Sequence, residues 1–488
     1  MRYTSTRDGT VNLSAPEVIV RGLADDGGLY LPAALPKLPR AFWRDMAKQS
    51  YAQRAAAVMS PFLEEYADGL LALCQKAYAG FASPATAPVT AVGNCYFLEL
   101  WHGPTCAFKD MALQALPYLL TASLDKLDEK RTACILVATS GDTGKAALEG
   151  FKDVPGTKII VFYPRDGVSD MQKRQMTTQE GGNVGVCAVE GNFDDAQNGV
   201  KAIFSDDALR REMNGKGLFF SSANSINWGR VLPQIAYYCS AYADMVAQGQ
   251  VDDGAPINIC VPTGNFGNIL SARYAGEMGL PVGKLICASN QNDVLTQFLR
   301  TGLYDRKRRF YNTLSPSMDI LISSNLERAL FSLSGQDDER VRRWMTQLRQ
   351  TGSYQVEQEI QAALDTLFYA GTCNEAQTRQ TIADTWQTHR YLLDPHTAVG
   401  LEVYNQYRRE TGDTTPTLVV STASPFKFAT AVLSALGKPV SESGNEARLS
   451  ALTGQDIPAP LNGLFEKPVR FGGTVGRDRM AEAVRELL

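Results

Sequence analysis

From about residue 94 onward, short runs of β-branched and other apolar residues alternate with glycine-containing turns and helical patterns. The runs occur in both halves of the chain, at 134–139, 158–163, 184–189, 257–262, 284–289 and 417–422. Continuous apolar strands that alternate with helices are typical of parallel sheets covered on both faces. We therefore predict an α/β fold of two doubly wound lobes, with ligands at the carboxyl ends of the strands.

The first 93 residues lack this alternation and predict a small N-terminal α/β module. A possible helix at 15–23 leads into a turn and a short strand at 29–31, and helical patterns follow. Pro84, Pro88 and the small residues beside them are typical of a linker. The chain of 488 residues is long enough for two to four domains. We predict three, at 1–93, 94–237 and 238–488.

Composition argues against several classes of protein. A net charge of -4 gives no general attraction for nucleic acid or for an anionic membrane surface. No run approaches the roughly 18 apolar residues of a membrane span. The charged N-terminus is not followed by an apolar segment, so we expect no signal peptide. We therefore predict neither a nucleic-acid partner nor a membrane partner.

The nine cysteines are scattered singly and form no C-x-x-C pair. An odd number of thiols inside apolar runs predicts reduced, buried cysteines in a cytoplasmic protein. Only three histidines are present, and no spacing of histidine, cysteine and carboxylate residues indicates a zinc site. We therefore expect no metal.

The stretch 102–110, His-Gly-Pro-Thr-Cys-Ala-Phe-Lys-Asp, lies between a strand-like run and a helical pattern that begins at Met111. Thr105 is placed to cap that helix as an acceptor, and Lys109 falls in the first turn. The partial positive charge of a helix start and the apolar neighbours of Lys109 both favour the neutral amine, which imine chemistry requires. The alternative is a surface lysine whose stem covers the start of the helix.

The stretch 263–268, Thr-Gly-Asn-Phe-Gly-Asn, connects a buried strand to a helix. Its two glycines allow backbone N–H groups to converge, and the helix dipole adds positive potential, so the loop suits a phosphate. Neither a Walker motif nor G-x-G-x-x-G is present, which favours a monoester such as a cofactor phosphate. The alternative is a strand-to-helix turn in which an asparagine caps the helix.

Two further turns end buried strands. Ser140 to Gly144 offers hydroxyls and backbone donors at a helix start, which predicts a second anion site. Asp142 is unexpected in such a site, and a helix-capping role explains it at least as well. Ser421 and Thr422 end another strand, where a hydroxyl either meets a ring nitrogen or bonds the local backbone.

Together these segments resemble threonine synthase, a pyridoxal-phosphate enzyme family of fold-type II that is similar to the tryptophan synthase β subunit. The similar segments are 102–110, 139–147, 222–230, 262–268, 315–330, 394–400 and 421–428, and the opening (3–7 with 23–31) is similar as well. They cover nearly the whole chain in the family's order. The stretches around Lys109 and Gly264 are the most specific.

The resemblance implies a site for pyridoxal 5'-phosphate, with Lys109 as the catalytic residue that forms the Schiff base. The residues expected to bind this cofactor are Lys109, Gly264, Asn265, Phe266, Gly267, Asn268 and Thr422. Of these, Thr422 would be the hydroxyl partner of the pyridine nitrogen. The residues expected to bind substrate are Ser140, Gly141, Asp142, Thr143, Asn224, Ser225 and Asn227.

The chain departs from the family pattern at Cys106, Lys145 and Ser424, which are usually other residues. The change at Cys106 is apolar and tolerable. Lys145 begins the helix beside the predicted anion site, so the contacts of a substrate phosphate stay open. The candidates are Ser140, Thr143, Lys145, Asn224 and Arg230.

The implied reaction converts O-phospho-L-homoserine and water into L-threonine and phosphate, a lyase step of threonine biosynthesis. Two alternatives within the same fold are a serine/threonine dehydratase and a phospho-lyase acting on a related phosphorylated amine. Two predicted anion sites favour a phosphorylated substrate over free serine. A cofactor-binding or regulatory module without turnover is a third hypothesis, which the intact Lys109 and full set of turns disfavour. Monomer and homodimer are both compatible with the sequence.

Overall fold

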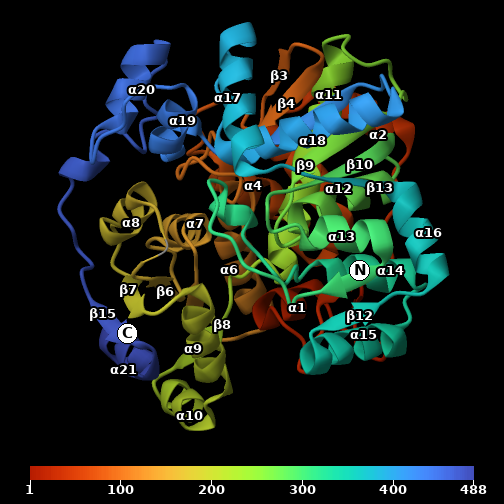
Figure 1. Cartoon of the computed structure of the whole chain (residues 1–488). Helices are drawn as coiled ribbons and strands as arrows, with labels where there is room; N and C mark the ends of the chain where they lie inside the picture. The colour runs from red at the N-terminus through yellow and green to blue at the C-terminus, as the bar shows by residue number, and fades with distance from the viewer. Residues whose placement is uncertain (167) are drawn as a thin grey trace.

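Two sheets of mainly parallel strands organise the molecule, which the computed structural model describes for residues 1–166 and 168–488 (Figure 1). The large sheet contains, from edge to edge, β13 (Phe368–Thr372), β10 (Val282–Ser289), β9 (Ile257–Pro262), β14 (Thr417–Ser421), β4 (Cys95–Glu99) and β3 (Val89–Val92). Only the edge strand β3 pairs antiparallel. The small sheet contains β15 (Thr474–Gly476), β7 (Val184–Glu190), β6 (Thr157–Pro164), β5 (Thr132–Ala138) and β8 (Leu218–Ser221), all parallel. The predicted α/β fold with two doubly wound lobes is confirmed.

Helices cover both faces of each sheet. Those of the large lobe are α11 (Trp228–Ala247), α12 (Gly267–Glu277), α13 (Val294–Thr301), α16 (Gln358–Leu367), α17 (Glu375–His389) and α18 (Pro395–Thr411). Those of the small lobe are α7 (Asp142–Phe151), α8 (Asp170–Thr177), α9 (Phe193–Ser205), α10 (Asp207–Gly215) and α21 (Met480–Leu487). In β9, Ile259 and Val261 pack in the buried cluster of α11 and α12, whereas Cys260 packs in the cluster of α18. Because strand residues alternate between faces, α18 and the α11–α12 pair cover opposite faces of the large sheet.

The N-terminal residues pack directly on the two lobes. They form β1 (Tyr3–Ser5), α1 (Ala15–Arg21), β2 (Tyr30–Pro32), α2 (Arg40–Asp45), α3 (Tyr51–Met59) and α4 (Leu70–Tyr78), with β1 and β2 antiparallel. The Trp228 indole N–H donates to the Tyr3 hydroxyl at 3.1 Å, and Arg54 Nη1 lies 2.6 Å from Asp244 Oδ1. One continuous hydrophobic core therefore joins these residues to the rest of the chain.

The remaining elements connect the lobes or lie beside them. They are α5 (Asp110–Leu113), α6 (Leu116–Lys126), β11 (Leu303–Asp305), α14 (Leu326–Leu333), α15 (Asp338–Thr351), β12 (Ser353–Gln355), α19 (Ala429–Ala435) and α20 (Asn445–Thr453). A short 3₁₀ turn, η4 (Pro316–Met318), lies in the long connection between β11 and α14.

The C-terminal segment crosses from the large lobe to the small one. After α20 the chain runs along the outside of the molecule to β15, which pairs with β7 (Figure 1). On the way, Arg174 of α8 donates to the carbonyl oxygens of Phe465 and Lys467, both at 2.5 Å. Each sheet therefore contains strands from both sides of residue 237. β4 precedes this residue and lies in the large sheet, and β15 follows it and lies in the small sheet. The division into domains at 93 and 237 stays a prediction.

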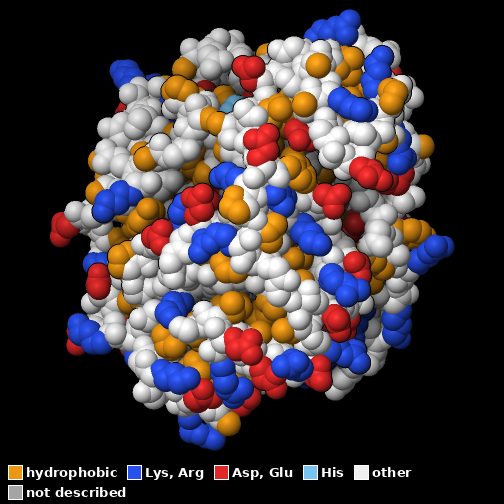
Figure 2. Space-filling model, turned by 90° about the vertical axis from the view of Figure 1, so that its left-hand side faces the viewer, with side chains coloured by type: hydrophobic (Ala, Val, Ile, Leu, Met, Phe, Trp, Pro, Cys, Tyr) orange, Lys and Arg blue, Asp and Glu red, His pale blue; other side chains and the backbone are white. Residues whose placement is uncertain are grey.

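Two features concern the expectation of no membrane and no nucleic-acid partner: the apolar length of the helices and the distribution of charge on the surface. None of the described helices is long and apolar enough to cross a membrane. On the face shown in Figure 2, acidic and basic side chains are interspersed. Nucleic-acid binding uses basic residues gathered on one face or stripe, and this face does not gather them.

Candidate active site

Lys109 lies directly before α5, at the position that caps this helix. The preceding loop is held by the Asp110 carboxylate, which accepts from Thr105 Oγ1 at 2.6 Å and from the Thr105 N–H at 2.8 Å. A Cβ on Gly103 would lie 2.5 Å from the same carboxylate, so this close approach requires glycine. The expectation that Thr105 caps the helix as an acceptor is wrong, because its hydroxyl donates to Asp110. These contacts fix the backbone that carries Lys109.

The side chain of Lys109 is 11% exposed. Its Nζ donates to Ser317 Oγ at 3.1 Å and lies 3.7 Å from Asp142 Oδ2. Burial lowers the pKa of the Lys109 amine to about 8; Asp142 opposes this shift, and Lys427 and Arg230 add to it. The alternative of a surface lysine is therefore wrong, and a substantial fraction of the amine is neutral just above neutral pH.

The carboxylate of Asp142 is the partner of two lysines. Asp142 Oδ1 lies 2.7 Å from Lys427 Nζ and accepts from Gln172 Nε2 at 3.0 Å, while Oδ2 accepts from Ser317 Oγ at 3.2 Å. Burial alone would raise the pKa of Asp142, but the charges of Lys427 and Lys109 hold it well below its usual range. Asp142 is the first residue of α7 and its side chain does not cap that helix. The capping alternative is wrong, and the carboxylate instead neutralises buried ammonium groups.

The turn between β9 and α12 presents its backbone to the site. In the described part of the chain, the N–H groups of residues 264–268 donate to no protein acceptor. Phe266 has a left-handed φ of +62°, which turns the chain into the helix. A Cβ on Gly264 would lie 2.7 Å from the carbonyl oxygen of Ser317, and Ser323 Oγ donates to the Gly264 carbonyl at 2.7 Å. Free N–H groups that converge at a helix start fit a phosphate.

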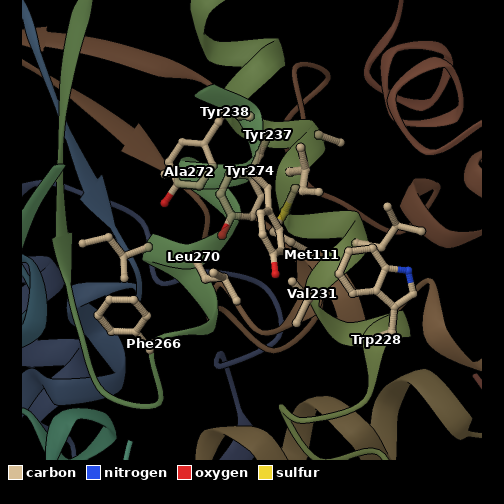
Figure 3. Close-up of a cluster of buried hydrophobic side chains, with 14 of the residues drawn as sticks. Met111, Trp228, Val231, Tyr237, Tyr238, Phe266, Leu270, Ala272 and Tyr274 are labelled. Atoms are coloured by element: carbon tan, nitrogen blue, oxygen red, sulfur yellow. The ribbon is translucent and has the colours of Figure 1, made fainter. Parts of the chain in front are cut away.

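The side chains of this turn are anchored away from the N–H groups. Phe266 is 1% exposed and its ring lies 5.7 Å from that of Phe368. Asn268 Oδ1 accepts from the hydroxyls of Tyr237, at 2.6 Å, and Tyr238, so the asparagine does not cap α12. Figure 3 shows Phe266 and the two tyrosines in the buried cluster around the start of α12. Asn265 is exposed, and its carbonyl oxygen accepts from the Asn325 N–H at 3.1 Å.

Thr422 lies opposite the Lys109 segment. β14 ends at Ser421, and the next residues run antiparallel to that segment, with a β-bridge between Ala107 and Ala423. The Phe108 N–H donates to the Thr422 carbonyl at 2.8 Å. Among the described residues, the Thr422 hydroxyl has no hydrogen-bond partner, so it stays available to a ligand.

The Lys109 segment and the turn at Gly264 meet at Ser317, while Thr422 is bonded to the Lys109 segment through the Phe108 N–H. The Ser317 hydroxyl touches Lys109 Nζ, and the Ser317 carbonyl oxygen packs against Gly264. An amine, a row of free N–H groups and a free hydroxyl match the aldehyde, the phosphate and the ring nitrogen of pyridoxal phosphate respectively. The residues present therefore fit this cofactor.

Of the two segments predicted to bind substrate, 140–143 lies beside Lys109, because Asp142 Oδ2 is 3.7 Å from Lys109 Nζ. Ser140 and Thr143 are half-buried beside Asp142 and their hydroxyls make no hydrogen bond within the described chain. Gly141 has a φ of +140° and precedes α7. In the other segment, Asn224 and Ser225 are half-buried.

Asn227 is already occupied by structural contacts. Its Oδ1 accepts from the Gly229 N–H at 2.8 Å, and its Nδ2 donates to the Ile19 carbonyl at 3.0 Å. The side chain thus caps α11 and ties it to α1, and a substrate contact for Asn227 stays a prediction.

Two candidates for contact with the substrate phosphate, Lys145 and Arg230, differ in whether their charges already have partners. Lys145 Nζ is 2.8 Å from Glu149 Oε2 and also donates to Gln179, so its charge is satisfied inside the small lobe. Arg230 is 3% exposed; its Nη1 donates to the Ala223 carbonyl at 2.6 Å, and its Nε has no partner within the described residues. Burial lowers the pKa of the Arg230 guanidinium to about 10. A buried cation with unused donors points to an anionic ligand.

Four site residues received no role from the sequence: Gln172, Ser317, His396 and Lys427. Lys427 and His396 lie inside segments that resemble the family, but nothing local separates them from a surface lysine or a core histidine. Their partners, Asp142 and Ser317, are distant in sequence. Ser424, a noted departure, caps the 3₁₀ turn after it by accepting from the Phe426 N–H at 3.4 Å.

Comparisons with known proteins agree with this geometry. Three family models match the chain: "Threonine synthase N terminus" over residues 2–78, "Pyridoxal-phosphate dependent enzyme" over 83–423, and "Threonine synthase, C-terminal" over 397–487. Threonine synthase-like 1 of Pongo abelii is 40% identical over 94% of this chain, and the chain spans 63% of that protein's length. Threonine synthase of Pseudomonas aeruginosa is 40% identical, with 96% of this chain and 95% of the relative covered.

The fold agrees as well. The crystal structure of PLP-bound threonine synthase from Brucella melitensis superposes with a TM-score of 0.88 at 37% identity, covering 100% of this chain and 99% of the other. Threonine synthase from yeast gives the same TM-score at 34% identity. The chain therefore belongs to the threonine synthase family of pyridoxal-phosphate dependent enzymes.

Proposed function

We propose that the protein is a threonine synthase that converts O-phospho-L-homoserine and water into L-threonine and phosphate. One observation carries this proposal: the buried amine of Lys109, with a pKa of about 8, lies 3.1 Å from Ser317, which also packs against the free N–H groups that begin at Gly264. A near-neutral amine beside a phosphate-binding turn is the arrangement that proton transfer to and from a cofactor-bound amino acid requires.

The cofactor is pyridoxal 5'-phosphate, which when bound supplies an electron sink that stabilises negative charge on substrate carbons. Lys109 would hold its aldehyde. The N–H groups of Gly264, Asn265, Phe266, Gly267 and Asn268 would hold its phosphate. The Thr422 hydroxyl would meet the ring nitrogen, and since a hydroxyl cannot keep this nitrogen protonated as a carboxylate would, it limits how strongly electron density is drawn into the ring.

Lys109 Nζ would move the protons. The reaction removes protons from the α- and β-carbons, breaks the bond between the γ-carbon and the phosphate oxygen, and adds a proton at the γ-carbon. Water then adds its oxygen at the β-carbon, and a proton returns to the α-carbon. A base that both takes and gives protons is most effective when its pKa lies near the working pH, as burial arranges for Lys109.

Arg230 is the strongest candidate for the substrate phosphate. It is buried, its Nε has no partner among the described residues, and it lies close enough to Lys109 to lower the pKa of that amine. Ser140, Gly141, Thr143, Asn224 and Ser225 would supply further hydroxyl and N–H donors around the substrate. Asp142 would balance the charges of Lys109 and Lys427 rather than touch the phosphate.

We infer the cellular location of the protein from the state of its cysteines. All nine cysteines are free and buried, which supports a reducing, cytoplasmic location. Monomer and homodimer both suit the proposal. The site lies between two lobes, and closure of one over the other would exclude water from the reaction.

An assay of two products tests the function. The purified protein, loaded with pyridoxal phosphate, is given O-phospho-L-homoserine, and phosphate and threonine are measured in parallel. Equal amounts of both are expected. Phosphate with a keto acid in place of threonine would assign the protein to the phospho-lyases, and turnover of free serine or threonine without phosphate to the dehydratases.

A further inference from the structure

Ser317 occupies a junction of the site. Its hydroxyl accepts from Lys109 Nζ at 3.1 Å and donates to Asp142 Oδ2 at 3.2 Å. Its carbonyl oxygen lies against Gly264, and its N–H donates to His396 Nε2 at 3.1 Å. The residue thus touches the reacting amine, the carboxylate beside it and the phosphate-binding turn.

Two buried residues, His396 and Asp394, hold Ser317 in place. Because His396 Nε2 accepts from Ser317, its ring proton lies on Nδ1 and is donated to Asp394 Oδ1 at 2.8 Å. The two side chains are 2% and 0% exposed. Asp394 Oδ1 also accepts from the His396 N–H at 2.9 Å, and the ring packs edge-on against Phe428 at 5.0 Å. The position of Nε2 is therefore determined from several sides.

The same carboxylate reaches the opposite side of the cofactor site. Thr397 Oγ1 donates to Asp394 Oδ2 and accepts from the Thr422 N–H at 3.3 Å. Asp394 thus positions both the residue beside Lys109 and the residue proposed to meet the ring nitrogen.

The hydroxyl of Ser317 separates two opposite charges. Lys109 Nζ and Asp142 Oδ2 are 3.7 Å apart with Ser317 Oγ bonded to both. At 3.7 Å this ion pair is looser than a direct hydrogen-bonded contact, which would favour the ammonium form of Lys109 more strongly. A hydroxyl accepts from an ammonium while it donates to the carboxylate, and it can turn its single proton to a neutral amine, so it serves both protonation states.

We propose that Ser317 is a further catalytic residue, whose hydroxyl keeps the Lys109 amine from closer contact with the Asp142 carboxylate and orients it in both protonation states, and that Asp394 and His396 are the positioning residues that hold it there. This inference rests on the proposed function for its role in turnover, but its effect on Lys109 does not require substrate.

The first test uses the cofactor-free protein. Competitive labelling of amines, followed by mass spectrometry of the peptide containing Lys109, gives the pH at which this amine is half reactive. The charged groups that face Lys109 are Asp142, Lys427 and Arg230, and none is altered in Ser317→Ala. Loss of the hydroxyl lets Lys109 approach Asp142, so the midpoint should rise by about one pH unit. Ser317→Thr should return it toward the wild-type value, and Ser332→Ala, a serine on α14, should leave it unchanged.

A wild-type midpoint in Ser317→Ala would overturn the inference. This outcome is separable from failure of the proposed function: a wild-type protein that makes no threonine would contradict the function, whereas the labelling midpoint would still report on Ser317. With threonine formation established, Ser317→Ala should lower kcat by roughly tenfold or more, and an unchanged kcat would also overturn it.

The second test separates the two sides of the histidine ring. The side-chain amide of His396→Gln can place an acceptor near the position of Nε2, whereas that of His396→Asn can place a donor near Nδ1. If the role of His396 is to hold Ser317, the glutamine variant should retain roughly tenfold more activity per bound cofactor than the asparagine variant. Its labelling midpoint should also stay closer to wild type. His389→Asn, on the exposed end of α17, is the matched control. Equal activities and midpoints of the glutamine and asparagine variants would overturn the positioning role.

Discussion

Lys427 Nζ lies 2.7 Å from Asp142 Oδ1, and both side chains are almost completely buried, at 0% and 2% exposed. Lys427 also donates to the Thr105 carbonyl at 3.0 Å, in the loop that leads to Lys109. The pair thus connects the start of α7 to the Lys109 loop and to the 3₁₀ turn after β14. Because Lys109 shares the same carboxylate, the pair contributes both to stability and to the electrostatics of the reacting amine.

Removing the charge of Asp142 should destabilise the protein in a pH-dependent way. Asp142→Asn leaves Lys427 buried without its carboxylate, which typically costs about 3–5 kcal/mol. The folded pKa of Asp142 lies below its unfolded value of about 3.9. Its contribution is therefore present above that pH and is lost as the pH falls further. Urea unfolding should show a large difference from wild type at pH 7 that shrinks toward pH 3.

Asp128→Asn serves as the control for this measurement, because Asp128 is an exposed carboxylate paired with the exposed Lys130. Its midpoint of unfolding should match wild type across the same pH range. A difference for Asp142→Asn that stays constant with pH would show that the carboxylate does not carry the effect.

The Lys109 amine should titrate far below an ordinary lysine. Burial lowers its pKa to about 8, compared with about 10.4 in model peptides. In the cofactor-free protein, labelling of Lys109 should be half-maximal near pH 8. A midpoint near 10 would place the amine in solvent and remove the basis of the proposed chemistry.

Replacing Lys109 should separate cofactor attachment from folding. Lys109→Ala should abolish the attachment of pyridoxal phosphate that borohydride reduction makes permanent, the absorbance of the imine, and threonine formation, since the imine is assigned to this amine. Lys152→Ala, an exchange at the surface end of α7, should keep all three. Retained turnover in Lys109→Ala would contradict the assignment.

A methyl group at Gly264 should weaken cofactor binding. The added Cβ would lie 2.7 Å from the carbonyl oxygen of Ser317, a backbone atom that cannot rotate away. Overpacking of this kind costs about 1–3 kcal/mol, so the affinity for pyridoxal phosphate in Gly264→Ala should fall by roughly tenfold to a hundredfold. Gly80→Ala, where a Cβ meets nothing within 4 Å, should bind like wild type. Absorbance titration of cofactor-depleted protein measures both, and equal affinities would show that the turn is not constrained by Ser317.

Arg230 should control recognition of phosphate. Arg230→Met removes a buried cation, so KM for the phosphorylated substrate and the inhibition constant of inorganic phosphate should both rise by roughly tenfold to a hundredfold. Arg230→Lys should restore part of this loss, whereas Arg211→Met on the exposed surface of α10 should have no effect. Unchanged inhibition by phosphate in Arg230→Met would remove Arg230 from the phosphate site.

The sequence allowed prediction of the fold because its signals are local. Continuous apolar runs such as 257–262 form strands where expected, and the following glycine turn leads into α12. Lys109 and the turn at Gly264 can be predicted because the stretches along the chain, taken together, resemble one family, whereas neither stretch alone excludes a surface lysine or an ordinary strand-to-helix turn. The role of Thr105 was wrong because its true partner, Asp110, competes for the hydroxyl at 2.6 Å.

Contacts between segments that are distant in sequence cannot be predicted from local sequence patterns. For Asp142 the sequence predicts a capping role or an unusual place in an anion site, since nothing near it in sequence indicates its pairing with Lys427. Sequence alone does not separate Lys145 from Arg230, whereas their contacts do: Lys145 pairs with Glu149, and Arg230 Nε has no partner in the part of the chain that the structure describes. Such distinctions depend on which side chains meet across the two lobes.

The pairing of β15 with β7 has a consequence for how the protein is made. The ribosome completes β5, β6, β7 and β8 long before it reaches residues 474–476. Until then the outer edge of β7 has unpaired N–H and C=O groups, which readily join strands of other chains. The β7 edge of the nascent small lobe is therefore open to aggregation from the completion of β7 until β15 emerges.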